Sequence, residues 1–163
     1  MKTSSERKAL MAMELGNRLF FRLYQCANLV HKTGTKALDR YGITTQQWAV
    51  LGALSRHSAA DGMTVGELAQ FLRVSRQNLS GVINRLEAMG LVERTKDAID
   101  QRSRRIRLSA KGRPLWHDEL VPRIDEYYSE VLVNFSTHDL VETLHYLSKL
   151  FENLKGIDTP DNG

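Results

Sequence analysis

A chain of 163 residues, 42% hydrophobic, 26% charged and with a formal net charge of only +4, can fold around one hydrophobic core but is too short for a second catalytic lobe. No apolar run approaches the ~20 residues of a membrane span, and the first ten residues lack the apolar core of a signal peptide, so we expect a cytoplasmic protein without a membrane partner. The single cysteine excludes an intramolecular disulfide, and five histidines without metal-binding spacing give no reason to expect a metal or another cofactor.

The first predicted element is one long amphipathic helix from Glu6 to about Lys36, because apolar residues recur there every three or four positions. Its apolar stripe consists of Leu19, Phe20, Leu23, Tyr24, Ala27 and Val30. Cys26 lies on the same helix, and we expect it to be a buried small hydrophobic residue.

A second helix is predicted after Gly42, which breaks the chain. Either Thr44 or Thr45 can cap its start. Its apolar face consists of Trp48, Leu51 and Leu54, and the segment HSAADG that follows is predicted to be a loop.

Two short helices joined by a tight turn are predicted within MTVGELAQFLRVSRQNLSGVINRLEAMGLVER. Thr64 and Glu67 form a capping box at the start of the first helix, whose inward-facing residues are Leu68, Ala69 and Leu72. After the turn RVS, Ser75 and Asn78 start the second helix, and Gly90 ends it. The buried face of this second helix comprises Leu79, Val82, Ile83 and Leu86. Two helices with so short a connection form a helix-turn-helix unit.

Two β-rich segments follow the helix-turn-helix. They are LVERT at 91–95 and RRIRLS at 104–109, and KDAIDQRS between them is the loop of a hairpin. A helix-turn-helix followed by a β-hairpin is a winged helix. The predicted fold class is therefore mainly α with a small β-hairpin wing.

Two further helices are predicted after the hairpin. The first runs from about Pro114 to Phe135, with a kink or local break at Pro122. The last helix is capped by STHD and carries a heptad-like apolar seam of Leu140, Leu144, Leu147, Phe151 and Leu154. We expect the terminal helices to dimerise the chain, with packing back on their own monomer as the alternative. The tail 156–163 is expected to be disordered.

Positive charge is concentrated in one quarter of the chain. Between Arg73 and Arg113 there are eleven Lys or Arg residues against four acidic residues, a net charge of +7, whereas the rest of the chain sums to −3. This distribution is typical of a polyanion-binding face on an otherwise nearly neutral body.

The order of these elements, with GELAQFLRVSRQNLSGVINRLEAMGLVER leading to DQRSRRIRLSAKG, resembles the MarR family of winged-helix transcription regulators over roughly residues 10–155. The resemblance implies a single MarR-type domain over 1–163, with dimerisation helices at 1–40 and 114–155 and a winged helix-turn-helix DNA-binding region at 44–112. It also implies a homodimer that binds a palindromic operator in double-stranded DNA, most often as a repressor of nearby genes. A small-molecule effector would release that operator.

Polar residues at the start of the second helix of the helix-turn-helix are suited to DNA. A helix N-terminus favours phosphates, Gln and Asn can pair with adenine, and Arg can pair with guanine. The expected DNA-binding residues are Ser75, Arg76, Gln77, Asn78, Ser80, Arg85, Arg94, Lys96, Arg102 and Arg104. Helix capping is the alternative role for Ser75 and Asn78, and simple solvation is the alternative for Arg85.

Within the wing, resemblance to the family's Asp-x-Arg pattern assigns Arg102 to the minor groove, where a narrow A·T tract concentrates negative potential. Asp100 is expected to shape the wing by pairing with a nearby arginine, such as Arg94 or Arg102. Arg105 and Arg107 alternate with apolar residues along the second strand, and a solvent-facing role suits them equally well.

Gly81 lies in the middle of a predicted helix, where glycine costs up to ~1 kcal/mol relative to alanine. This cost suggests that the helix approaches DNA or another helix closely at that position.

The family architecture would bring several aromatic side chains together between the DNA-binding and dimerisation regions. Such rings, together with a polar Tyr or His, suit an aromatic acid, its thioester or a related anion as effector. The expected effector-binding residues are Phe20, Tyr24, His31, Trp48 and Trp116, with burial in the core as the alternative for each. A redox response through Cys26 is a further alternative, although the peroxide-sensing branch of the family carries its cysteine where this chain has Phe20.

An enzyme is not expected, because no Ser-His-Asp, HExxH or Gly-rich phosphate-binding pattern is present. Two other functions remain open on the sequence alone. One is a non-specific architectural DNA-binding protein, and the other is a winged helix used only for protein contacts.

Overall fold

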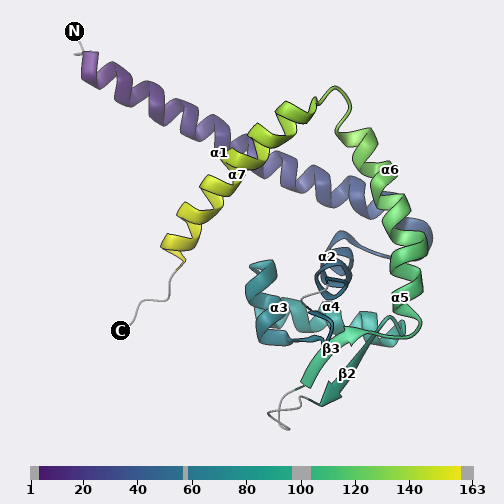
Figure 1. The fold of residues 1–163 in the computed structure, drawn as a ribbon. Coiled ribbons are helices and arrows are strands. Elements are labelled where there is room, and N and C mark those ends of the chain that lie inside the picture. The colour runs from purple at the N-terminus through teal and green to yellow at the C-terminus, as the bar shows by residue number, and fades with distance from the viewer. Residues whose placement is uncertain (1–3, 57–58, 97–103, 159–163) are drawn as a thin grey trace, which may run out of the picture. The chain divides into compact units, whose positions relative to one another are not determined.

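The computed structural model describes residues 4–56, 59–96 and 104–158. The chain forms two compact units, Met1–Tyr127 and Tyr128–Gly163, which are taken in turn below. The described elements are mainly helices with one small antiparallel sheet, which confirms the predicted fold class (Figure 1).

The first unit begins with α1, Ser4–Ala37, a single long helix as the periodicity predicts. A short 3-10 turn, η1 (Asp39–Tyr41), separates it from α2 (Thr45–Leu54). Of the two possible caps, the structure selects Thr44: its hydroxyl accepts a hydrogen bond from the backbone N–H of Gln47. The side-chain oxygen of Gln47 in turn accepts from the backbone N–H of Thr44 at 2.8 Å.

The helix-turn-helix consists of α3 (Val65–Leu72) and α4 (Arg76–Ala88). The predicted capping box starts α3: the hydroxyl of Thr64 accepts from the backbone N–H of Glu67, and the carboxylate of Glu67 accepts from the backbone N–H of Thr64. The turn between the helices is tight because Arg73 adopts the left-handed conformation, with a φ of 55°, and ends α3.

The predicted hairpin is formed by β2 (Val92–Lys96) and β3 (Arg104–Leu108), which pair antiparallel. A third strand, β1 (Met63–Thr64), pairs with the other edge of β3, so the strand order is β1-β3-β2. The sequence does not predict β1, because two residues are too few to show the alternation of a strand. Since β1 runs directly into α3, it joins the hairpin to the helix-turn-helix.

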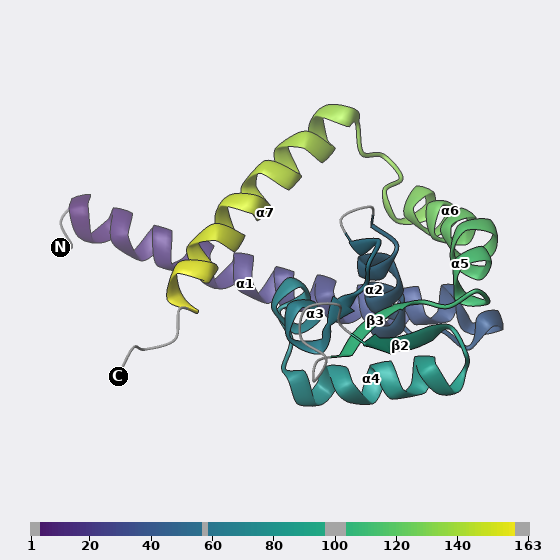
Figure 2. The ribbon, with the colours of Figure 1, turned by 60° about the horizontal axis from the view of Figure 1, so that its bottom comes forward.

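One hydrophobic core holds α2, α3, α4 and the sheet together with the helix that follows the hairpin. Its most completely buried side chains are Leu38, Ile43, Val50, Leu51, Leu68, Leu79, Ile83, Leu86, Leu91, Ile106 and Leu120. The predicted inward face of α4 is buried in full. Figure 2 shows α4 along one side of this unit, below α3 and the hairpin, while the N-terminal part of α1 extends away from the core.

The helix after the hairpin is built from α5 (Gly112–Pro114), a π-helical segment (Leu115–Leu120) and α6 (Val121–Val131). The π-helical segment ends just before Pro122, where the sequence predicts a kink or break. Its last turn is wide because the N–H of Val121 donates to the carbonyl of Trp116, five residues earlier. The predicted end at Phe135 is wrong: Asn134 takes a left-handed φ of 68°, and the helix ends at Val131.

The second unit contains α7, Thr137–Ile157. Ser136 caps it as predicted: its hydroxyl accepts from the backbone N–H of Asp139. The carboxylate of Asp139 accepts from the Ser136 hydroxyl at 2.6 Å and from the Ser136 backbone N–H at 2.9 Å. These two hydrogen bonds, the hydroxyl's first, lower the pKa of Asp139.

The predicted start of the tail at residue 156 is wrong, because α7 includes Gly156 and Ile157. The helix continues there since the N–H of Asp158 still bonds to the carbonyl of Leu154. Residues 159–163 lie outside the described residues, so the prediction for them stays a prediction.

Cys26 is exposed, so its predicted burial is wrong. The reason is its place on α1: from Ser4 to Thr33 this helix lies beyond the core, and most of the predicted apolar stripe is exposed as well. Within the described ranges, no helix is long and apolar enough to cross a membrane.

Candidate nucleic-acid interface

The start of α4 presents polar side chains to the surface. Ser75 acts as the cap, with its hydroxyl accepting from the backbone N–H of Asn78 at 3.2 Å, so the capping alternative holds for this serine. The side chains of Arg76, Gln77 and Asn78 are exposed. Ser80 is half-buried, and its hydroxyl donates to the carbonyl of Arg76 within the same helix. Arg76, Gln77 and Asn78 are therefore the side chains of this turn that a partner molecule can reach.

Gly81 lies on the exposed side of α4, opposite the buried face. A Cβ added to Gly81 would have no described atom within 4 Å apart from its own helix and neighbours. No helix of the described chain therefore explains the glycine. The partner that this glycine could admit, DNA or a helix, would therefore have to belong to another molecule.

The hairpin carries two cations side by side at the strand ends that adjoin residues 97–103. Lys96, the last residue of β2, lies directly opposite Arg104, the first residue of β3, and both are exposed. Like charges at opposed positions of an antiparallel pair destabilise it. A negatively charged partner at this point would remove that cost.

The other hairpin arginines bond to residues of this chain. Arg94 on β2 donates from Nε to the carboxylate of Glu87 at 2.9 Å and from Nη2 to the side-chain oxygen of Asn84 at 2.7 Å, both on α4. Arg107 donates from Nε to the carboxylate of Glu93 at 2.7 Å across the hairpin. Sequence reasoning missed these acceptors, because nothing in the spacing indicates which arginine faces a neighbouring helix.

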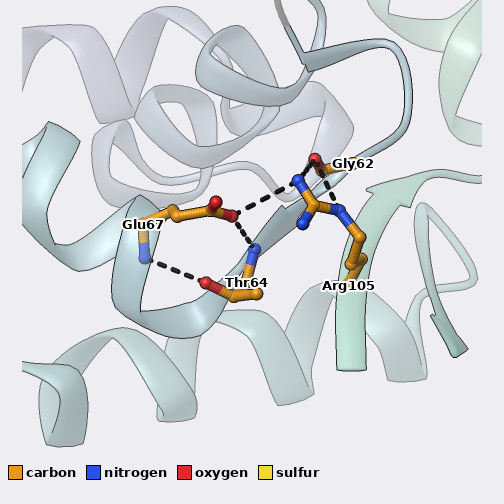
Figure 3. Close-up of polar contacts among 4 residues, drawn as sticks. All are labelled: Gly62, Thr64, Glu67 and Arg105. Atoms are coloured by element: carbon orange, nitrogen blue, oxygen red, sulfur yellow. Dashed lines mark hydrogen bonds and ion pairs between the residues drawn. The ribbon is translucent and has the colours of Figure 1, made fainter. Parts of the chain in front are cut away.

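Arg105 makes its contacts on the side of β3 that faces β1, away from β2. Its Nε and Nη2 both donate to the backbone carbonyl of Gly62, and Nη2 lies 3.4 Å from the carboxylate of Glu67 (Figure 3). A purely solvent-facing role is therefore excluded for Arg105. Arg85 is exposed on α4, and Asp100 and Arg102 lie outside the described residues, so their predicted roles stay predictions.

The residues predicted to bind an effector lie at different places. His31 shares a hydrogen bond with the hydroxyl of Thr45, and Trp48 is half-buried on the same side of α2. Phe20 and Tyr24 are exposed on α1, roughly 16 Å and 10 Å along the helix axis from His31. Trp116 is only 8% exposed, with its ring against Gly52, and belongs to the core. The structure thus brings His31 and Trp48 into one neighbourhood and leaves Phe20 and Tyr24 apart from it, while Trp116 packs in the core against Gly52, one turn of α2 after Trp48.

Tyr127 is a member of that neighbourhood that sequence reasoning missed. Its ring meets the ring of Trp48 edge-on, with 6.0 Å between centroids, and its hydroxyl lies 2.8 Å from the hydroxyl of Thr33 on α1. The same end of α1 is held by Arg123, which donates from Nε to the carbonyl of Ala37. Tyr127 lies within the helix predicted from about Pro114 to Phe135, but the sequence pattern does not indicate which element its side chain meets.

Comparison with known proteins agrees with this arrangement. The family model described as "MarR family" matches residues 41–103. The transcriptional activatory protein BadR of Rhodopseudomonas palustris is 53% identical over 157 residues, which cover 96% of this chain and 90% of that protein. The homoprotocatechuate degradative operon repressor of Escherichia coli is 29% identical over 112 residues, 69% of this chain and 73% of that protein.

A solved structure supports the fold. The 2,4-dichlorophenol-bound form of the organohalide-sensing regulator RdhR-CbdbA1625 covers 90% of this chain and 85% of its own, with a TM-score of 0.78 at 22% identity. The family match spans the helix-turn-helix and β2, and the most extensive of these sequence similarities covers nearly the whole chain. The chain therefore belongs to the MarR family of winged-helix transcription regulators, which are DNA-binding proteins and not enzymes.

Proposed function

We propose that this regulator acts as a homodimer that binds a palindromic operator and is released from it by a small aromatic or anionic ligand. The observations that carry the DNA-binding part are the exposed polar turn at the start of α4 and the exposed, opposed cations Lys96 and Arg104 of the hairpin. Two cations held opposite each other at the loop end of a hairpin are suited to a pair of phosphates.

Each element then has its own task on DNA. Arg76 and Gln77 contact base edges in the major groove, with Asn78 and Ser80 beside them. Lys96, Arg104 and Arg85 contact phosphates, and Arg102 enters the flanking minor groove. For Arg94, whose guanidinium bonds to α4, we propose a role in holding β2 against that helix.

Apolar surface supports the homodimer. The seam of α7 is exposed in the single chain, with Leu144 at 67% and Leu147 at 46%, and the stripe of α1 is exposed at Phe20 and Tyr24. Leaving such helix faces in water is unfavourable, and a second copy of the chain can cover them. A two-fold axis would also set two copies of α4 about one turn of DNA apart, as an inverted repeat requires. The division into dimerisation segments 1–40 and 114–155 and a DNA-binding region 44–112 is part of this proposal.

The effector site is proposed to lie where α1, α2 and α6 meet. His31, Trp48 and Tyr127 offer a ring nitrogen, an indole face and a hydroxyl to an aromatic ligand with an anionic group. RdhR-CbdbA1625 was solved with 2,4-dichlorophenol, which gives a precedent for an aromatic ligand in this fold.

Two directions of regulation are open to such a protein. Repression is the expectation that the family resemblance gives, and the Escherichia coli relative is named a repressor. The 53% identical relative is named an activatory protein, and this observation favours activation as the second candidate. Bound DNA is the same in both cases, and the place of the operator relative to the promoter decides between them.

A selection experiment tests the DNA-binding proposal. The full chain is incubated with a pool of random duplexes, and the bound duplexes are recovered and sequenced. We expect an inverted repeat whose half-sites are centred about one helical turn apart, roughly 10 base pairs. Recovery of duplexes without any common sequence would indicate an architectural protein. Recovery of no duplex would indicate a module for protein contacts.

Fluorescence tests the effector proposal. The variant Trp116→Phe leaves Trp48 as the only tryptophan, so its emission reports on the proposed site. Aromatic carboxylates and chlorophenols that bind there should change this emission and lower the affinity for the selected duplex. The same ligands should have a weaker effect on a chain that also carries His31→Ala. A ligand that releases DNA without changing the Trp48 emission would place the effector elsewhere.

A further inference from the structure

Arg105 makes a three-part contact on the edge of the sheet that faces away from β2. Its Nε and Nη2 donate to the carbonyl of Gly62 at 3.2 Å and 2.8 Å, and Nη2 also approaches Oε2 of Glu67 at 3.4 Å (Figure 3). About a quarter of the Arg105 side chain is exposed, compared with about half of the Arg107 side chain on the same strand. Arg105 is thus engaged with the loop before β1 and with the start of α3.

The acceptor on α3 is the capping residue itself. Oε2 of Glu67, which Arg105 approaches, also accepts the backbone N–H of Thr64 at 2.7 Å. Thr64 in turn is the partner of Arg105 in the β1–β3 pairing. One carboxylate therefore links the guanidinium of the hairpin, the strand β1 and the first turn of α3.

The pairing between β1 and β3, beside which Arg105 makes its contacts, is short. β1 offers only the pairs Met63 with Ile106 and Thr64 with Arg105, so few ladder hydrogen bonds attach the hairpin to the helix-turn-helix on this side. The backbones also lie very close: Gly62 has a φ of +84°, and a Cβ there would lie 2.6 Å from the carbonyl oxygen of Ile106. The two hydrogen bonds from Arg105 to the carbonyl of Gly62 fix the distance and the direction between β3 and the segment that leads into β1.

From this geometry we infer that Arg105 is a positioning residue of the wing. It sets the angle at which the hairpin leaves the helix-turn-helix, and thereby the place where the wing meets DNA, without contacting DNA itself. The inference rests on the proposed binding of DNA by α4 and the wing. It separates Arg105 from Lys96 and Arg104, which belong to the same basic hairpin and are exposed at the strand ends that adjoin residues 97–103.

Substitution by lysine tests the inference, because lysine keeps the charge and loses the two-pronged geometry. The matched control is Arg107→Lys: Arg107 lies two residues further along β3, and its ion pair with Glu93 stays within the hairpin. The full-length wild type, Arg105→Lys and Arg107→Lys are titrated with the selected inverted-repeat duplex at several salt concentrations. Amide hydrogen exchange of β1 and β3 is measured on the same proteins without DNA.

For Arg105→Lys we expect affinity to fall roughly fivefold, the effect of one lost hydrogen bond, with an unchanged slope of log K against log salt. We also expect faster exchange in β1 and β3. Arg107→Lys should match the wild type in both measurements. Equal affinities for the two variants, or unchanged exchange in Arg105→Lys, would overturn the inference.

A second variant covers the case in which Arg105→Lys does not fold. Glu67→Gln keeps an oxygen for the capping box but removes the negative charge beside Arg105. If Glu67 acts only as a negative charge near DNA, removal of that charge should strengthen DNA binding. If Glu67 helps Arg105 to position the wing, loss of the contact between Arg105 and Glu67 should weaken DNA binding. Tighter binding by Glu67→Gln would therefore overturn the inference. Failure of the proposed function looks different, because the wild type itself would then show no preference for the selected duplex.

Discussion

Gly112 and Leu91 approach so closely that only a glycine fits at position 112. A Cβ on Gly112 would lie 1.9 Å from the carbonyl oxygen of Leu91, and Gly112 is buried. The same carbonyl accepts the backbone N–H of Ser109 at 3.1 Å, and the hydroxyl of Ser109 accepts the N–H of Gly112 at 2.9 Å. This contact joins the start of the hairpin to the start of the helix that follows it.

The variant Gly112→Ala should lose stability, because backbone atoms on both sides must move to admit the methyl group. Overpacking of this kind costs about 1–3 kcal/mol, and the rigid backbone partner favours the upper end. Urea unfolding followed by circular dichroism measures the change. A variant as stable as the wild type would show that this junction can relax, which the structure does not indicate.

Gly81→Ala should have opposite effects on stability and on DNA binding. No described atom opposes a methyl group there, so the helix should gain up to about 1 kcal/mol of stability. Affinity for the selected duplex should fall if the backbone of α4 approaches DNA at this position. Gly156→Ala, in the equally open last turn of α7, is the control and should leave DNA affinity unchanged. Full DNA affinity in Gly81→Ala would show that α4 does not lie close to DNA there.

The dimer proposal predicts that Leu144→Lys produces monomers, because it places a charge in the apolar seam of α7. Leu144 is 67% exposed in the single chain, so the substitution should not disturb the fold of the monomer. Val141→Lys, at a position 59% exposed and outside the seam, is the control and should remain dimeric. Truncation after Asn134 should also abolish the dimer. Sedimentation velocity distinguishes the species, and a stable dimer of the truncated chain would contradict the proposal.

The cap of α7 should respond to acid. The pKa of Asp139 is lowered by its hydrogen bonds to Ser136, so the folded state binds a proton less readily than the unfolded state does. The stabilisation is present above the ordinary pKa of an aspartate and is lost as the pH falls through the lowered value. In Ser136→Ala the pKa of Asp139 should rise, because the hydroxyl that contributes most is gone. Carboxyl NMR titration checks this, and an unchanged pKa would assign the shift to another group.

Much of this fold can be predicted from the sequence because its signals are local. The capping box at Thr64, the cap at Ser136 and the buried face of α4 follow from local sequence alone, and the structure confirms them. β1 could not be predicted, because a two-residue strand exists only through its pairing with β3. Exposure of Cys26 could not be predicted either, since periodicity shows that a helix has an apolar face but not what covers it.

For the candidate site, too, the sequence predicts what local structure determines and does not predict what tertiary packing determines. Exposure of Arg76 and Gln77 follows from their position at the start of α4, which local capping determines. The partners of Arg94 and Arg105 depend on how the hairpin packs against two different helices, and no local pattern encodes that. Net charge marks the basic quarter of the chain, but only tertiary structure separates arginines bonded within the protein from those left exposed.

The most direct test of the account is competition binding by wild type and Gln77→Ala to the selected duplex and to a shuffled duplex of the same composition. The wild type should prefer the selected duplex by at least about a thousandfold. Gln77→Ala should lose roughly fivefold to 150-fold of that preference while binding the shuffled duplex as before. Gln46→Ala, an exposed glutamine of α2, should behave as the wild type. Undiminished preference in Gln77→Ala would contradict the assignment of α4 as the element that recognises the operator.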